Sequence, residues 1–193
     1  MDLNQFLEST NFLETIVTQS RKNGAEAGAL VSGLTDAQLN WKPAPEKWSI
    51  AQCLEHLTAA SRGFNPYFVD ALARGGQKFA AASPPAYRPT FMGSWLIKYV
   101  QPQNPRKLPA PKIFRPSASN VRNALDKFHE QQGEFRQFVG ETEGIDYNKT
   151  RLRSPVTPLI RYSLADAYVI TVLHEQRHLA QARRVREMPG FPN

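Results

Sequence analysis

The chain has 193 residues, of which 41% are hydrophobic, with a single cysteine and a formal net charge of +7. This hydrophobic fraction fills one sizeable core and excludes a disordered chain, and a single cysteine excludes an intrachain disulfide. No apolar stretch is long enough to cross a bilayer, and the first residues lack the basic and apolar regions of a secretory signal. We therefore expect a single domain, residues 1–193, in the cytoplasm.

The first predicted helix covers residues 4–31. Its imperfect apolar face consists of Phe6, Leu13, Val17 and Leu30. A short helical turn should follow at residues 36–39, because Thr35 and Gln38 have the spacing of a capping box.

The second predicted helix begins after Ser49, whose hydroxyl can accept from the amide of Gln52 while Gln52 reaches back. Trp48 precedes this cap and is expected to pack on Cys53. Apolar side chains then recur at three- and four-residue steps, at Ile50, Cys53, Leu54, Leu57, Phe64, Phe68 and Leu72. Gly75 and Gly76 are expected to end the helix.

Residues 77–116 are rich in proline, and no acidic residue occurs between Asp70 and Asp126. The basic residues in that interval are Arg74, Lys78, Arg88, Lys98, Arg106, Lys107, Lys112, Arg115 and Arg122. Such an excess can attract nucleic acid, anionic lipid or an acidic small molecule. No nucleic-acid motif accompanies the charge, so we favour a solvated basic loop over a nucleic-acid site.

Inside this insert, residues 91–100 are predicted to form a short amphipathic helix. We expect it to cover the end of the bundle; a lid over a pocket is the alternative. A loop as long as the whole insert is uncommon in a compact domain, where it is either functional or mobile.

The third helix is predicted to start at Ser117 or Ser119 and to extend to about residue 139. The fourth should begin after Pro155 and Pro158, with Ser163 as its cap, and extend to about residue 187. No strand-like alternation of useful length appears. The pattern predicts an all-α fold, a four-helix bundle with a long proline-rich basic insert between its second and third helices.

Three of the four histidines have positions that point to a shared purpose. His174 and His178 are four residues apart on the fourth helix, which places their Cβ atoms about 5–6 Å apart on one face. His56 lies beside the apolar stripe of the second helix and should point toward the bundle. Facing helices of a bundle are a known place for a metal site, so we consider a three-histidine divalent site.

Other interpretations stay open at this point. A histidine pair at this spacing also occurs by chance on surface helices, and an inward histidine is often a hydrogen-bonded core residue. His129 has polar neighbours and is predicted to be exposed, and Cys53 fits the core better than a ligand set. The segment 174–178 also matches the zinc-protease pattern H-E-x-x-H, with Glu175 as the general base, but no good third ligand follows it.

Two short motifs resemble the DinB/YfiT-like family. They are WSIAQCLEHL at residues 48–57, which opens the second helix, and HEQRHLAQ at residues 174–181. The resemblance implies a four-helix bundle, often dimeric, with metal ligands at His56, His174 and His178. Many members have an Arg-Gly-type pair after the last histidine, where this chain has Leu179 and Ala180, and the long insert is not a general feature of the family.

The resemblance also implies a range of functions. Some relatives resemble metal-dependent transferases that use a low-molecular-weight thiol such as bacillithiol, mycothiol or glutathione. We therefore expect a divalent ion (Zn, Ni or Fe) that activates a small thiol or water toward a small-molecule substrate. Glu55 and Glu175 neighbour ligands and are the weak catalytic candidates. The alternative is a non-catalytic, stress-associated metal-binding protein that acts through dimerisation or an interaction surface.

Overall fold

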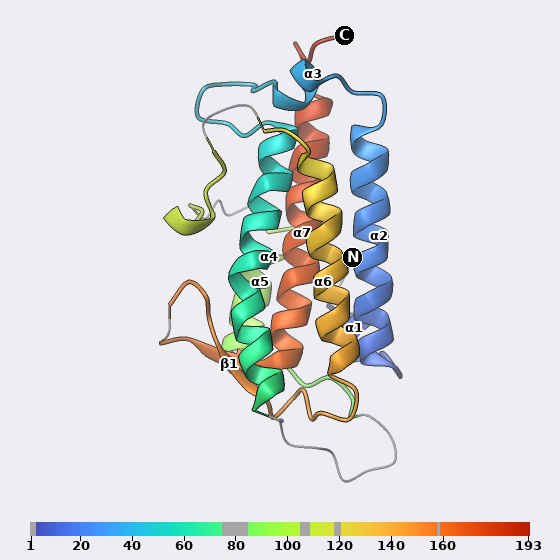
Figure 1. Ribbon diagram of the computed structural model, residues 1–193, viewed down its shortest axis with the longest axis vertical. Coiled ribbons are helices and arrows are strands. Elements are labelled where there is room, and N and C mark those ends of the chain that lie inside the picture. The colour runs from blue at the N-terminus through green and yellow to red at the C-terminus, as the bar shows by residue number, and fades with distance from the viewer. Residues whose placement is uncertain (1–2, 75–84, 105–108, 118–120, 158) are drawn as a thin grey trace.

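The computed structural model describes residues 3–74, 85–104, 109–117, 121–157 and 159–193. The long helices form a bundle (Figure 1). They are α2 (Phe12–Val31), α4 (Ile50–Ala73), α6 (Ala124–Glu141) and α7 (Leu164–Arg186). The shorter elements are α1 (Asn4–Leu7), α3 (Asp36–Asn40), α5 (Phe91–Val100), the 3-10 turn η1 (Lys112–Phe114), β1 (Arg151–Arg153) and β2 (Arg161–Ser163). The predicted four-helix bundle is confirmed.

The order of the helices around the bundle differs from a simple up-and-down arrangement. Helices α2 and α7 point in one direction, and α4 and α6 in the other (Figure 1). Each of α2 and α4 packs against both α6 and α7. Because α4 and α6 are parallel neighbours, the chain between them returns along the length of the bundle. Helix α4 has 24 residues and is therefore about 36 Å long. An extended chain needs at least about ten residues to span that length. Part of the long insert is therefore a topological necessity.

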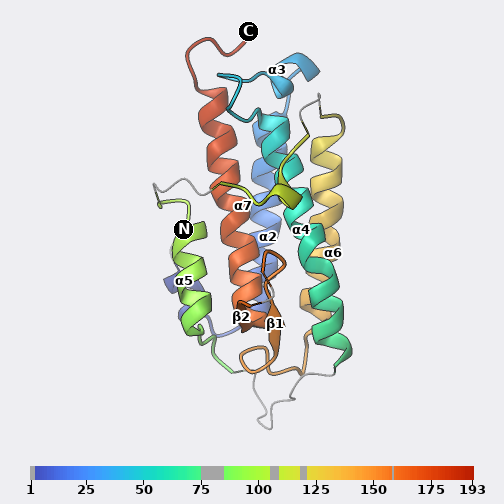
Figure 2. The same ribbon diagram turned by 90° about the vertical axis from the view of Figure 1, so that its left-hand side faces the viewer.

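Helix α5 forms at residues 91–100 as predicted, but it covers the flank of α7 rather than the end of the bundle (Figure 2). Two residues of α7 hold it there. Asp166 accepts hydrogen bonds from the hydroxyls of Tyr87 and Thr90, both 2.8 Å long. Arg177 donates to three carbonyls at and beyond the other end of α5, among them that of Tyr99 at 3.3 Å.

The helix starts follow local capping chemistry. Thr35, Ser49 and Ser163 each form the reciprocal capping box that their spacing predicts. The first predicted helix is instead two helices, because the side chain of Asn11 accepts from the amide of Glu14 and starts α2 afresh. Ser119, Gly75 and Gly76 lie outside the described residues, as do Lys78, Arg106, Lys107 and Pro158.

The third helix starts later than predicted, at Ala124. Ser117 does not cap it, since its amide and hydroxyl both donate to Glu55. Asn123 precedes the helix with a φ of 54°, in the left-handed region that asparagine tolerates. The chain also contains a hairpin that the sequence did not predict, with Leu152 paired to Tyr162. Strands of three residues are too short to show an alternating pattern.

Cys53 is fully buried in a small apolar cluster with Ile50 and Ala182, against which Trp48 packs. The prediction that Cys53 belongs to the core is confirmed. None of the helices in the described part of the chain combines the length and apolar character needed to cross a membrane.

Candidate metal centre

The three histidines singled out in the sequence meet between α4 and α7. His56 comes from the second turn of α4, and His174 and His178 from successive turns of α7. Their ring centroids are 5.1 Å apart for His56 and His174, 4.5 Å for His56 and His178, and 4.6 Å for His174 and His178. One ring nitrogen from each lies within 4.8 Å of the other two. The rings are therefore close enough to share a single ion.

The spacing of one nitrogen pair in this cluster can be compared with that of two ligands on one ion. Nε2 of His56 lies 3.3 Å from Nε2 of His174. Two nitrogens that bind one tetrahedral ion at about 2.0–2.1 Å are themselves about 3.3–3.4 Å apart. The spacing of this pair thus fits a shared ion without rearrangement of the helices.

The opposite ring nitrogens contact oxygen acceptors. Nδ1 of His56 donates to the carbonyl of Phe114 at 2.7 Å, and Nδ1 of His178 donates to Oε1 of Gln181 at 3.1 Å. A proton on Nδ1 leaves Nε2 free to bind a metal, and such partners also fix the orientation of the ring. Both histidines are therefore arranged to present Nε2 to the centre of the cluster.

The surroundings favour neutral imidazoles. His56 is 3% exposed and His178 is 9% exposed. Burial lowers the pKa of His56, and it lowers that of His178 well below its usual value, with further contributions from His174 and His56. Burial, assisted by His56 and Arg177, lowers the pKa of His174 to about 3. Neutral histidine is the form that binds a metal, so the donor set suits a divalent cation.

Trp48 also contacts the cluster, a role that the sequence did not indicate. Its indole ring lies 4.8 Å from the ring of His56 and 5.7 Å from that of His178. Its position before the cap of α4 marked it only as a packing residue. Trp48 is half-buried. Because its ring lies against both imidazoles, it shields one side of them from water.

The two carboxylates next to these histidines make hydrogen bonds outside the three-histidine group. Oε2 of Glu55 accepts from the amide and hydroxyl of Ser117 at 2.7 and 3.1 Å. Oε2 of Glu175 accepts from Asn23 at 2.8 Å and from Gln132 at 3.1 Å. Burial raises the pKa of Glu175 to about 7, against the opposing effect of those hydrogen bonds. In the described part of the chain, neither residue joins the three-histidine group.

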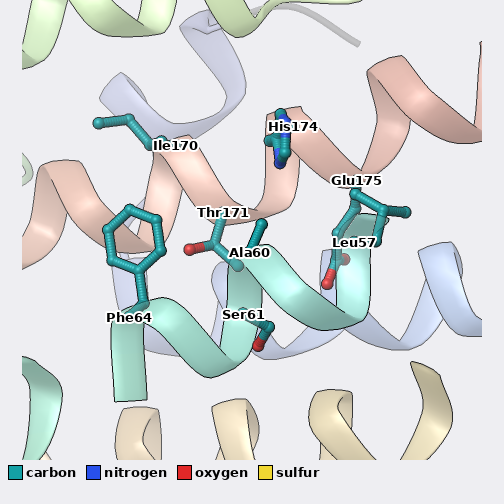
Figure 3. A pocket seen from close by; sticks show the side chains of 8 residues that line it. All are labelled: Leu57, Ala60, Ser61, Phe64, Ile170, Thr171, His174 and Glu175. Atoms are coloured by element: carbon teal, nitrogen blue, oxygen red, sulfur yellow. The ribbon is translucent and has the colours of Figure 1, made fainter. Parts of the chain in front are cut away.

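A small cavity of about 20 Å³ borders His174 and has room for about one water molecule (Figure 3). Its lining is mainly apolar and consists of Leu57, Ala60, Ser61, Phe64, Ile170, Thr171, His174 and Glu175. In Figure 3 the ring of His174 and the side chain of Glu175 leave α7 in different directions. Ser61 and Thr171 are further lining residues with polar side chains.

The remaining sequence candidates lie outside the cluster. His129 is exposed, as predicted, and its Nε2 lies 3.1 Å from the carbonyl of Gly24. The zinc-protease interpretation of residues 174–178 gains no support, because the third histidine of the group comes from α4, upstream of the motif.

Comparisons with known proteins agree with this architecture. The family model of the DinB superfamily matches residues 19–182. Among solved structures, YfiT from Bacillus subtilis is similar with a TM-score of 0.56 and 16% identity, over 93% of this chain and 88% of that one. YfiT is described as "a probable metal-dependent hydrolase with an unusual four-helix bundle topology". At this identity the likeness concerns the fold. A search of curated proteins finds no match.

Proposed function

The chain belongs to the DinB superfamily, and on that premise we propose that it is a metal-dependent hydrolase of a small-molecule substrate, with its divalent ion held by His56, His174 and His178. The observation that carries the proposal is the convergence of three ring nitrogens within 4.8 Å of one another. The description of YfiT as a probable metal-dependent hydrolase supports it further.

The protein orients the imidazole rings and covers one side of them against bulk water. His56, His174 and His178 would hold a divalent ion that keeps its charge and an open position, and the ion would supply Lewis acidity and lower the pKa of a bound water. The Phe114 carbonyl holds the ring of His56, Gln181 holds that of His178, and Trp48 covers both. The cavity beside His174 offers space for about one water.

Of the two candidate carboxylates, we propose Glu175 for proton transfer. Glu175 lines the cavity that borders His174, whereas Glu55 is tied to Ser117. The Glu175→Gln variant should retain its metal and lose turnover if this assignment holds. Turnover equal to that of the wild type would contradict the assignment of proton transfer to Glu175.

A small thiol is the alternative nucleophile at the same open position, where it would be deprotonated. We place water first because the cavity beside His174 matches the size of a water molecule. The two nucleophiles are separated by adding thiols to the assay.

The test is turnover by protein loaded with Zn, Ni or Fe(II). Activated esters and amides report hydrolysis, and monochlorobimane with bacillithiol, mycothiol or glutathione reports thiol transfer. We expect hydrolysis to fall at least about 100-fold in His174→Ala, because the ligand set is broken, and to persist in His129→Ala, whose histidine lies outside the cluster. Metal-loaded wild type that is no faster than His174→Ala on any substrate would contradict the proposal and favour the non-catalytic alternative.

A further inference from the structure

We propose that the return segment between α4 and α6 positions the ligand His56 through residues 114–117, so that metal affinity depends on how this segment docks on α4. The inference rests on the metal site proposed above. Three separate contacts support it, all on one face of α4.

The first contact is the hydrogen bond to the ligand itself. The acceptor on Nδ1 of His56 is the main-chain carbonyl of Phe114, 2.7 Å away. A main-chain carbonyl cannot be repositioned by a side-chain rotamer, so the orientation of the imidazole follows the path of the segment. Partners of this kind typically change metal affinity by about 10–100-fold.

The second contact fixes Phe114. Its side chain is 6% exposed and lies directly on the backbone of Gly63, seven residues after His56. A Cβ atom at Gly63 would lie 2.4 Å from Cε1 of the Phe114 ring, closer than packed atoms approach. The absence of a side chain at position 63 therefore allows the segment to come close enough for its carbonyl to reach His56.

The third contact holds the segment on the other side of Phe114. Glu55 accepts from the amide of Ser117 at 2.7 Å and from its hydroxyl at 3.1 Å. Nε2 of Gln52 donates to the carbonyl of Ser117 at 2.7 Å. Gln52 lies three residues before Glu55 and four before His56, so its side chain is a neighbour of both on the helix surface. The carbonyl of Phe114 is thus held between two attachments to α4.

These contacts give Glu55 a definite role as a positioning residue. It ties residue 117 to the helix turn that carries His56, without touching the ring. They also give part of the long insert a purpose beyond its return along the bundle.

The test uses Gly63→Ala, Phe114→Ala and the double variant, with Gly28→Ala as the matched control, because a Cβ at Gly28 meets nothing within 4 Å. The readouts are Zn²⁺ affinity, by competition with a chromogenic chelator, and the His56 tautomer in metal-free protein, by ¹⁵N NMR. Gly63→Ala should weaken Zn²⁺ binding about tenfold or more and reduce the population with a proton on Nδ1. In the Phe114→Ala background, Gly63→Ala should cause little further loss of Zn²⁺ affinity, since the obstructing ring is gone.

Wild-type affinity and tautomer in a folded Gly63→Ala protein would overturn the inference. If Gly63→Ala does not fold, Glu55→Ala replaces it, because this side chain is partly exposed and its loss removes two of the hydrogen bonds that hold Ser117 on α4. Wild-type protein that binds no Zn²⁺ would defeat the proposed function, while the tautomer measurement would still decide whether residues 114–117 position His56.

Discussion

The chemistry of the cluster depends on which nitrogen of each ring carries the proton. His56 and His178 both donate from Nδ1, to a main-chain carbonyl and to an amide oxygen respectively. That choice leaves the Nε2 lone pair of each of these two rings available to bind a metal. Burial, assisted by His56 and Arg177, lowers the pKa of His174, the third proposed ligand, to about 3, so its ring stays neutral throughout the ordinary range of pH.

Cys53 provides a test at the residue scale, since it lies one helical turn before His56 yet belongs to the core. It is fully buried, and burial raises the pKa of its thiol to about 12. We expect no reaction with a thiol reagent at mildly alkaline pH in the native state, and complete reaction in guanidinium chloride. Rapid native labelling, or loss of metal in Cys53→Ala, would show that the thiol faces the site.

Some site residues were predictable from the sequence and others were not. The spacing of His174 and His178 placed both on one face of a helix, and the apolar stripe directed His56 inward. The hydrogen-bond acceptor from Phe114 could not be found, because a main-chain carbonyl has no residue signature and lies 58 residues away in sequence. The contact of Gln181 with His178 has a sequence signal, because residues three apart on a helix are neighbours on its surface.

At the scale of elements, Asp166 connects the starts of two helices. Its carboxylate accepts from the Ser163 amide at 3.0 Å in the cap of α7, and from the hydroxyls of Tyr87 and Thr90, both at 2.8 Å, at the start of α5. Gly93 allows this approach, since a Cβ there would lie 2.1 Å from the Asp166 carboxyl carbon. One buried carboxyl group therefore joins the return segment to α7.

Asp166→Ala should lower the free energy of unfolding by about 2–4 kcal/mol, because it leaves several buried donors without an acceptor. It should also increase hydrogen exchange in residues 91–100. Asp126→Ala, at an exposed position in the first turn of α6, should change the free energy by no more than about 0.5 kcal/mol. Denaturation by guanidinium chloride measures both, and equal effects would contradict the role assigned to Asp166.

Elements with strong local signals were predictable, and those set by tertiary contacts were not. Capping boxes located the starts of α3, α4 and α7. The start of α6 was wrong because Ser117, a good local cap, is held by Glu55 instead. Helix α5 had the right bounds but the wrong location, since its attachment to Asp166 and Arg177 depends on side chains more than 70 residues away.

The whole molecule combines a parallel pair, α4 and α6, with a long return path between them. The proposed metal ligands come from the antiparallel pair α4 and α7, so the site requires that these two helices pack together. The homodimer that the family resemblance implies stays a prediction, which analytical ultracentrifugation would check.

Buried tyrosines should make the bundle sensitive to alkali. Burial, reinforced by Asp146, raises the pKa of Tyr147 to about 12, and burial also raises the pKa values of Tyr87, Tyr162 and Tyr168. Unfolded tyrosines lose their protons near pH 10, so above that pH the folded state binds more protons than the unfolded state. The free energy of unfolding should therefore fall as pH rises through about 10.

Tyrosinate absorbance recorded together with circular dichroism checks this expectation. The buried tyrosines should ionise in the same transition in which helicity is lost. Ionisation of all the tyrosines near pH 10 with the helices intact would show that these side chains are accessible to water.

The most direct test of the account is the metal content of the protein after incubation with Zn²⁺ and desalting, measured by elemental analysis. We predict about one ion per chain in the wild type and in His129→Ala, and none in folded His56→Ala or His174→Ala. A wild type that retains no ion, or a His56→Ala variant that retains a full equivalent, would contradict a site shared between α4 and α7.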